Sequence, residues 1–289
     1  MSENKNFKEE TIKLVNLRIK ELQDLGMLDI PSDYSVGNAL QYAWFKLQEL
    51  KGGANAKYAP ALEICEPDSI VFSLVKMVTD GLTVAKSQCY FMVRKAGNKF
   101  NLDYGQEYQG KIALAKRYSG ILSIDHQVVY NGEHYEVKCI DGIKSIEHQP
   151  DMDKFDYDQI KGAYCVVTEK DDKKKAFELS MQQIEISWLY QFVDKDNPIE
   201  KLLKEKTRLK SVHSAFKPQM CEKAVINYAM KGYINRSNDS AIIPEKKELP
   251  EAKETLSINT KQPEKKTLEI KPEEKKPVEI TKEEEGPGY

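Results

Sequence analysis

The chain has 289 residues and a formal net charge of −2, so it can hold one large or two small domains and is not uniformly basic. No apolar run approaches the length of a membrane span, and the five scattered cysteines contain no Cys-x-x-Cys pair. These features exclude an integral membrane protein and a closed disulfide framework. The first residues are polar and charged, unlike a signal peptide, so we expect a soluble protein of the cytoplasm.

Three helices are predicted in the first part of the chain. Residues 7–25, 35–50 and 67–80 each have helical patterning, and a glycine follows each of them closely. The third carries one apolar stripe, with Gly81 where a C-terminal cap belongs. Residues 1–66 show no basic excess, and we expect this helical region to pack or to mediate contacts between protomers.

A basic and aromatic segment follows. Residues 89–95 and 99–104 are predicted to form a hairpin, and residues 107–118 a helix. Between Lys86 and Tyr118 there are seven Lys or Arg against two acidic residues, with four tyrosines among them. Basic groups neutralise phosphates and aromatic rings stack on bases, so this mixture is typical of a single-strand nucleic-acid surface. A solvated basic face with its tyrosines half in the core would have the same composition.

The next part of the chain is predicted to be mostly strand. Residues 121–130 and 133–140 flank Asn131-Gly132, which is a strong signal for a type I′ hairpin turn. Residues 160–169 and 173–179 form a second predicted hairpin. Helices, then hairpins with one helix inserted, then helices again indicate an α+β fold with an antiparallel sheet packed against helices, not an alternating parallel sheet.

Two more helices are predicted after the strands. Ser180 and Gln183 form a capping box that opens a helix to about Tyr190. The last helix begins near Pro218, which is well placed at a first helical position. Its predicted buried stripe consists of Cys221, Ala224, Val225, Tyr228 and Ala229.

Charge is strongly segregated along the chain. Residues 201–236 contain nine basic and two acidic residues, whereas residues 133–158 contain eight acidic residues and three lysines. If these blocks fold onto different faces, one face can hold a polyanion while patches of opposite sign attract neighbouring copies. A net charge near zero therefore does not argue against nucleic-acid binding, and we expect residues 67–240 to form an α+β core that binds single strands. Residues 241–289 are rich in Pro, Glu and Lys, a composition that predicts a disordered tail.

Three catalytic patterns are weak here. Gly105, Gly110 and Lys111 match the phosphate-binding loop G-x-x-x-x-G-K, but Ile112 replaces the Ser or Thr that would hold magnesium, which disfavours an ATPase. The four histidines show no ligand spacing. A metal nuclease would need carboxylates that converge, and the candidates have no defined spacing: Asp103, Glu107, Asp141, Glu147, Asp151 and Asp153.

Six different short motifs follow one another between residues 70 and 233. The run Leu-Ala-Lys-Arg-Tyr-Ser-Gly at residues 114–120 is similar to the Leu-Ala-Arg-Arg-Ser-Gly of the RecT family of phage recombination proteins, which anneal single strands. Five further segments resemble that family: Gly81-Leu82, Tyr108-Gln109-Gly110, and residues 146–150, 178–185 and 220–224. Each motif alone is weak, but six in the same order are fairly specific.

The resemblance implies a protein that anneals DNA without ATP, assembles into a ring or filament, and acts in phage-type homologous recombination and repair. It also implies a phage exonuclease and a host single-strand-binding protein as partners, in the bacterial cytoplasm. The chain departs from the family pattern at three positions. Gln109 and Asn227 stand where Arg is usual and Glu107 where the family has Gly, so Asn227 is not among the predicted contacts.

We expect an oligomer that holds one strand through its phosphates in a shared basic groove, with no catalytic residue, metal ion or cofactor. The first group of predicted phosphate contacts is Arg94, Lys95, Lys99, Lys111, Lys116 and Arg117. The second group is Lys206, Arg208, Lys210, Lys217 and Lys223. Tyr104 and Tyr108 are predicted to stack on bases. Two other classes stay open: a metal-dependent nuclease of a phage recombination system, and a structural assembly protein that binds no DNA.

Overall fold

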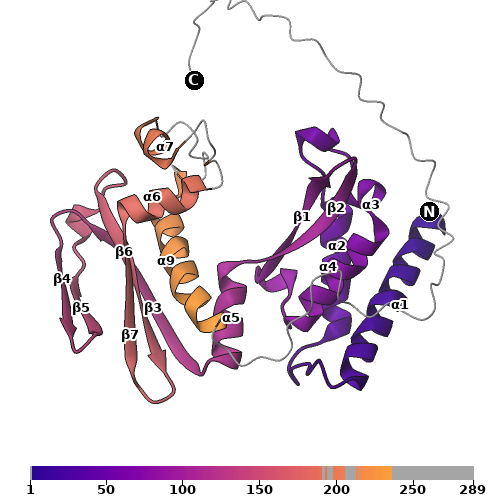
Figure 1. The fold of residues 1–289 in the computed structure, drawn as a ribbon, viewed down its shortest axis with the longest axis horizontal. Coiled ribbons are helices and arrows are strands. Elements are labelled where there is room, and N and C mark those ends of the chain that lie inside the picture. Colours follow the sequence, from indigo (N-terminus) through magenta and orange to yellow (C-terminus); the bar gives the residue numbers. More distant parts are fainter. Residues whose placement is uncertain (1, 191–192, 194–197, 206–212, 214, 236–289) are drawn as a thin grey trace, which may run out of the picture. The chain divides into compact units, whose positions relative to one another are not determined.

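The computed structural model describes residues 2–190, 193, 198–205, 213 and 215–235 (Figure 1). These residues form an α+β fold with antiparallel strands, which confirms the predicted class. They build two hydrophobic cores, and the helix α5 (Tyr108–Tyr118) contributes to both, because Leu114 belongs to the first core and Ala115 to the second. The predicted tail lies outside the described residues.

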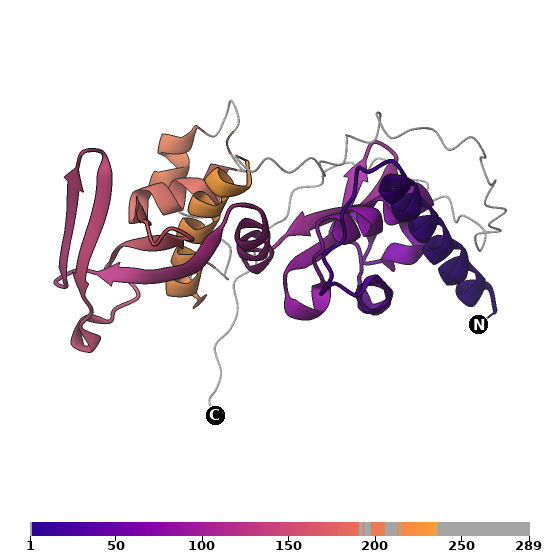
Figure 2. The ribbon, with the colours of Figure 1, turned by 90° about the horizontal axis from the view of Figure 1, so that it is seen from below.

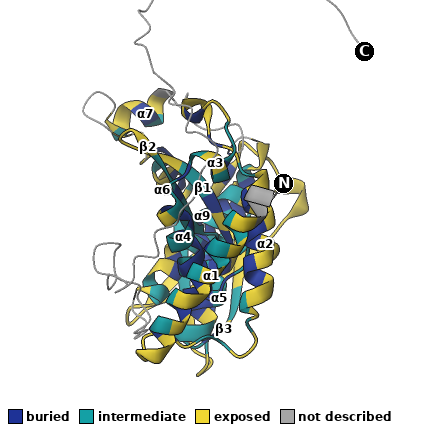
Figure 3. Cartoon of the chain, turned by 90° about the vertical axis from the view of Figure 1, so that its right-hand side faces the viewer, coloured by how far each residue is buried: buried dark blue, intermediate teal, exposed yellow. Residues whose placement is uncertain are grey.

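The first core is built by the N-terminal helices and one hairpin. α1 (Ser2–Asp24) and α2 (Val36–Glu49) both contact α4 (Pro67–Thr79), and Figure 3 shows these helices with buried and exposed sides. The hairpin strands β1 (Cys89–Ala96) and β2 (Lys99–Gln106) add Phe91 and Leu102 to this core. Three short elements complete this part: η1 (Ala54–Ala56), α3 (Ala61–Ile64) and η2 (Val84–Lys86).

Two serine hydroxyls of α4 bind the backbone of β2. Ser73 Oγ donates to the carbonyl of Leu102 at 2.7 Å, and the Leu102 N–H donates to Ser69 Oγ at 2.9 Å. A buried backbone group without a partner costs about 1–3 kcal/mol, so the serines allow β2 to lie against the helix inside the core. The hairpin is therefore held firmly on the N-terminal helices.

The second core lies between a three-stranded sheet and helices. The strands β3 (Ile121–Tyr130), β6 (Ile160–Glu169) and β7 (Lys174–Ser180) pair antiparallel in the order β3-β6-β7. α9 (Lys217–Ile234) contacts all three strands and also packs on α5 (Figure 1). α6 (Met181–Leu189) contacts β6, β7 and α9, and is followed by α7 (Ile199–Glu205).

The predicted hairpin around Asn131-Gly132 is wrong. β3 pairs with β6, whereas β4 (His134–Ile140) pairs with β5 (Ile143–Gln149), a strand that was not predicted, in a separate two-stranded ladder beside the sheet (Figure 2). A type I′ turn needs positive φ at both central residues. Asp141 and Gly142 meet this condition with φ of 50° and 80°, but only Gly132 of the other pair does. The tight turn is therefore at Asp141-Gly142.

Other local predictions are confirmed. The hairpins β1–β2 and β6–β7 form, Ser180 and Gln183 make the capping box, and α9 has its proline in the first turn. The stripe of α9 differs at two positions, because Tyr228 is 56% exposed and Ala224 is only partly buried, while Ile226 and Met230 are fully buried. The α1 and α2 helices of the predicted N-terminal region share the first core with α4 and the hairpin. The division of the chain at residue 66 stays a prediction.

Candidate nucleic-acid interface

The start of α5 is anchored on the segment that leads into β1. The Glu107 N–H donates to the Gln88 carbonyl at 2.9 Å, and a Cβ added at Gly110 would collide with the same carbonyl. Within the described part of the chain no side chain caps the first turn of this helix. The first amide groups of a helix lack intrahelical partners and carry partial positive charge, so this end of α5 favours an anion.

Lysines from two distant helices meet at this helix start. Lys111 Nζ of α5 donates to Asn227 Oδ1 of α9 at 2.7 Å, and Lys223 Nζ of α9 lies 2.8 Å from Glu107 Oε2. Burial lowers the pKa of Lys111, and the charges of Lys223 and Lys231 lower it further, whereas Glu107 raises it. Lys111 thus lies within electrostatic range of two other ammonium groups and of the Glu107 carboxylate, which pairs with Lys223. We call Lys111, Lys223 and Lys231 the lysine cluster.

The structure brings together Lys111 and Lys223, which were predicted from two different basic blocks. It adds Lys231, which the sequence argument missed. Lys223, Asn227 and Lys231 follow one another at intervals of four residues, so they lie on one side of α9. This spacing was the available signal. The three positions that depart from the family pattern also gather here, because Glu107 and Asn227 bind the cluster and Gln109 lies in the first turn of α5.

The β1–β2 hairpin places its basic residues on two faces. Directly opposite residues share a face of an antiparallel pair, so Arg94 lies with Lys99 and Asp103 on the outer face, away from the Phe91 and Leu102 side. Arg94 Nε pairs with Asp103 at 2.7 Å and Lys99 with Glu66 at 3.1 Å. Both pairs are solvent-exposed and therefore weak, so a phosphate can compete for these cations. Lys95 is exposed on the other face.

Lys116 and Arg117 are neighbours in sequence but have different surroundings. Lys116 is exposed near the end of α5. Arg117 instead donates to the carbonyls of Asp80, at 2.8 Å, and Gly81, at 3.3 Å, where α4 ends. Arg117 therefore joins α5 to α4, and this use of its guanidinium favours a structural role.

The two tyrosines predicted to stack on bases also differ. The Tyr104 hydroxyl donates to Asp80 Oδ2 at 2.6 Å, and its ring packs against the first core beside Phe91. Burial, followed by the charge of Asp80, raises the pKa of Tyr104 far above its ordinary value. The hydroxyl and the ring of Tyr104 are thus both engaged within the protein, and its stacking role stays a prediction. Tyr108 is half-buried in the first turn of α5 and stays a candidate.

The second group of predicted contacts is only partly described. Lys217 lies in the first turn of α9, and its Nζ is 3.7 Å from Asp158. Lys206, Arg208 and Lys210 lie outside the described residues. Their part in DNA binding stays a prediction.

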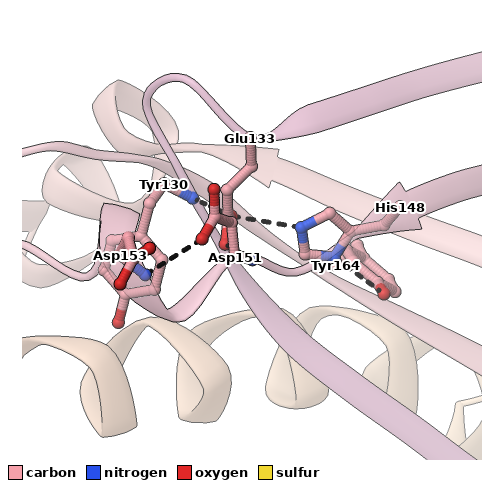
Figure 4. Close-up of polar contacts among 6 residues, drawn as sticks. All are labelled: Tyr130, Glu133, His148, Asp151, Asp153 and Tyr164. Carbon is pink, nitrogen blue, oxygen red and sulfur yellow. Dashed lines mark hydrogen bonds and ion pairs between the residues drawn. The ribbon is translucent and has the colours of Figure 1, made fainter.

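The acidic block carries a buried polar network. The Glu133 carboxylate accepts hydrogen bonds from the backbone N–H groups of Tyr130 and Asp151 and lies 3.1 Å from His148 Nε2 (Figure 4). His148 Nδ1 is 3.2 Å from the hydroxyl of Tyr164 on β6. The His148 and Glu133 side chains are only 1% and 2% exposed. The network therefore attaches the β4–β5 ladder to the sheet.

Among the described residues, His134, Glu136 and Glu147 form one group with metal-ligand geometry. All three are exposed, and Lys138 Nζ lies 3.4 Å from Glu136 and 3.1 Å from Glu147. The lysine ammonium thus already pairs with both carboxylates. Nothing in this arrangement favours the nuclease alternative.

The fold is α+β with antiparallel strands, and lysines gather at the uncapped N-terminus of α5. These features fit the class of proteins that bind the phosphates of a nucleic acid. Comparison with known families gives a match to the RecT family over residues 47–262. This match covers most of the chain, and the chain belongs to the RecT family. Its proteins bind single-stranded DNA, form oligomers and act in phage-type recombination by annealing single strands. A search of curated proteins found no match.

The described helices were also compared with the requirements for a membrane span. None of them combines the length and the apolar composition needed to cross a bilayer. This finding agrees with the absence of long apolar runs in the sequence.

Proposed function

We propose that this protein anneals complementary DNA strands without ATP, as an oligomer whose protomers together hold one strand in a basic groove. The observation that carries the proposal is the lysine cluster at the uncapped start of α5. Each protomer would contribute one such cluster, and each cluster would hold phosphate groups while the bases stay open to an incoming strand.

The chemistry of the cluster suits a phosphate better than a carboxylate. A phosphate accepts hydrogen bonds from ammonium groups and from free helix amides at the same time. In the protein alone, Glu107 is the counter-charge of Lys223. A bound phosphate would replace Glu107 as the partner of Lys223, so binding would proceed by ion exchange and respond steeply to salt.

Annealing itself needs no nucleotide hydrolysis. Stacking in a DNA duplex is worth about 1.4 kcal/mol per base step, so pairing releases the free energy that drives the reaction. The protein has only to hold strands extended and close together. On this proposal Arg94, Lys99 and Lys116 extend the groove from the lysine cluster, Lys95 contacts DNA from the other face of the hairpin, and Tyr108 offers a ring to a base.

The remaining roles follow the family. The N-terminal helices would mediate contacts between protomers, and the protein would act beside a phage exonuclease and a host single-strand-binding protein in the bacterial cytoplasm. Residues 241–289 would recruit partners or keep the protein in solution.

One gel experiment separates the three classes of function. Complementary labelled oligonucleotides are mixed with the full chain, with and without magnesium and ATP. We expect paired, full-length product in every lane, because neither magnesium nor ATP takes part. Degraded strands in the magnesium lanes alone would identify a nuclease. An absence of any retarded oligonucleotide at low salt would identify a structural protein and contradict the proposal.

A further inference from the structure

A pocket of about 590 Å³ lies in front of the first turn of α5. Its walls come from the end of α2, from η2, from β1 and from the start of α5. Sites for small molecules usually measure roughly 300–1,000 Å³, so this pocket is large enough for one organic ligand. None of the predicted phosphate contacts lines it, whereas Tyr108, one of the two tyrosines predicted to stack on bases, does.

The walls of this pocket are aromatic and apolar. Tyr90, Phe91 and Tyr108 belong to its lining, and Cys89 lies buried on the same face of β1 as Phe91. Burial raises the pKa of the Cys89 thiol to about 12, so it stays uncharged and adds to the apolar lining. The Tyr90 ring is 38% exposed and rests on Gly105, where an added Cβ would collide with the ring. One face of Tyr90 is thus held in place by the backbone of β2.

The charged groups of the lining are mostly cationic. Lys86 is exposed and Lys46 pairs with Glu49 at 3.0 Å in an exposed, weak ion pair. Among the described residues that line the pocket, Glu107 is the one carboxylate, and it is bound to Lys223. The pocket therefore combines flat apolar surfaces with a positive edge.

The segment that carries Lys86 is well ordered by local hydrogen bonds. The Thr83 N–H donates to Gln88 Oε1 at 3.1 Å, and the Ala85 N–H donates to Thr83 Oγ1 at 3.2 Å. The Gln88 carbonyl in turn accepts the Glu107 N–H. The edge of the pocket is therefore built before any ligand arrives, and little conformational entropy is lost on binding.

We propose that this pocket binds one nucleotide, with its base against the tyrosine rings and its phosphate at Lys86. The proposal rests on the proposed function, and it adds a base-binding site to a groove that otherwise holds phosphates. A planar base fits the aromatic walls, and an anionic phosphate matches the positive edge. The nucleotide belongs either to the bound strand, as one base per protomer turned out of the stack, or to a pool of free nucleotides.

The test compares a normal oligonucleotide with one of equal length in which every sugar lacks its base. The full chain should bind the normal strand more tightly, because only that strand can fill the pocket. Tyr90→Ala should weaken binding of the normal strand by about 5- to 150-fold, as stacking on one base predicts, and should leave binding of the abasic strand unchanged. Equal losses on both strands would overturn the proposal.

Two further variants and a control separate a loss of binding from a loss of folding. Tyr90→Phe keeps the ring on Gly105 and should bind both strands like the unaltered chain. Lys86→Gln removes a phosphate partner and should weaken both strands alike, with a salt slope flatter by roughly 0.7. Tyr42→Ala, which removes an exposed tyrosine of α2 that does not line the pocket, is the matched control. An effect of Tyr42→Ala as large as that of Tyr90→Ala would also overturn the proposal.

A direct binding experiment distinguishes the two sources of the nucleotide. Deoxyadenosine monophosphate is added to the full chain without DNA, and binding is followed by equilibrium dialysis. Binding that Tyr90→Ala abolishes assigns the pocket to free nucleotides, whereas no binding, together with the loss on the normal strand, assigns it to the strand. A full chain that anneals DNA, treats normal and abasic strands alike and binds no free nucleotide would reject the pocket and leave the proposed function standing.

Discussion

Glu107 has the most direct control over charge at the start of α5. Its carboxylate lies 2.8 Å from Lys223 Nζ and raises the pKa of Lys111, which burial lowers. A phosphate that approaches this end of the helix meets the lysine cluster with one charge already neutralised. Glu107 therefore weakens the attraction for DNA that the three lysines would otherwise exert.

Replacing Glu107 by Gln should tighten the binding of single-stranded DNA. The amide keeps the size of the side chain but leaves Lys223 without its counter-charge. We expect the slope of log affinity against log salt to steepen by up to about 0.7, the contribution of one phosphate neutralised on a single strand. Fluorescence anisotropy of a labelled oligonucleotide over a salt series measures this slope. Glu63→Gln, on the exposed side of α3, is the control, and an unchanged slope would place Glu107 outside the groove.

We expect Tyr104 to contribute to the stability of the folded protein and not to stack on a base. Tyr104→Phe keeps the ring but removes the hydroxyl that donates to Asp80 at 2.6 Å. Because hydrogen bonds to charged groups contribute about 1.5–3 kcal/mol, the free energy of unfolding should fall by about that amount in urea titrations. Tyr58→Phe, at an exposed tyrosine, should have no such effect. Weaker DNA binding by Tyr104→Phe at unchanged stability would return Tyr104 to the binding surface.

Among the secondary-structure elements, the β4–β5 ladder depends most on its attachment. Two strands alone are marginal in water, so the ladder needs contacts with the sheet. Besides the network of Glu133 and His148, the Tyr135 hydroxyl and Lys144 Nζ bind Glu178 of β7 at 3.0 and 2.8 Å. These polar contacts fix a ladder that has no ladder hydrogen bonds to the other described strands.

Glu133→Gln should loosen this ladder in a pH-dependent way. Burial raises the pKa of Glu133, but hydrogen bonds from the Asp151 and Tyr130 amides and from His148 outweigh it and hold the pKa below its ordinary 4.5. A carboxyl group whose pKa is lowered by folding stabilises the folded state at pH values above its ordinary pKa. This contribution disappears as the pH falls through the pKa of the folded state. Near neutral pH the variant should lose about 1–3 kcal/mol.

The measurement is thermal or urea unfolding of both proteins across the acid range. The difference between Glu133→Gln and the unaltered chain should be largest at neutral pH and should shrink below pH 4.5. Glu136→Gln, at an exposed position of β4, is the matched control. A difference that does not change with pH would mean that the charge of Glu133 plays no part.

At the level of the complete fold, α5 is the element on which both cores and the lysine cluster depend. Its apolar residues enter both cores, Arg117 binds the end of α4, and Lys111 binds α9. The position of the lysine cluster therefore follows from the packing of α5 against α9. Changes that remove charge without disturbing this packing test the cluster best.

Lys223→Gln combined with Lys231→Gln should flatten the salt dependence of DNA binding. Two lost phosphate contacts on a single strand correspond to a change in slope of roughly 1.4, with a parallel loss of annealing at moderate salt. Lys138→Gln with Lys154→Gln removes the same charge from exposed lysines of the acidic block and should change neither value. Equal effects of the two double variants would show that only net charge matters.

Deleting residues 241–289 should leave the annealing of naked oligonucleotides intact. The lysine cluster and the pocket lie entirely within residues 46–231, whereas the deletion removes only the last part of the family match, residues 241–262. The gel assay with complementary strands measures this directly. If the truncated protein is folded but does not anneal, the tail takes part in the reaction and the proposed division of the chain is wrong.

Local patterns in the sequence were sufficient for most single elements. The capping box of α6, the proline that opens α9 and the alternating strands of β1–β2 depend on residues a few positions apart. Such signals act within one or two turns of chain, so they can be read without knowing the rest of the fold. The α+β class and the RecT family followed from the order of these elements and motifs.

The partners of each element were decided by contacts between distant residues. β3 pairs with β6 and not with its neighbour β4, because the chain leaves the sheet at Asn131, whose N–H binds the carbonyl of Gln159. Lys111 and Asn227 meet across 116 positions of sequence, and so do Glu107 and Lys223. No local pattern encodes such meetings, since they depend on how whole helices and sheets bury their apolar faces together. That is why six motifs were enough to recognise the family, while Lys231 and the pocket at Tyr90 emerged only from the packed molecule.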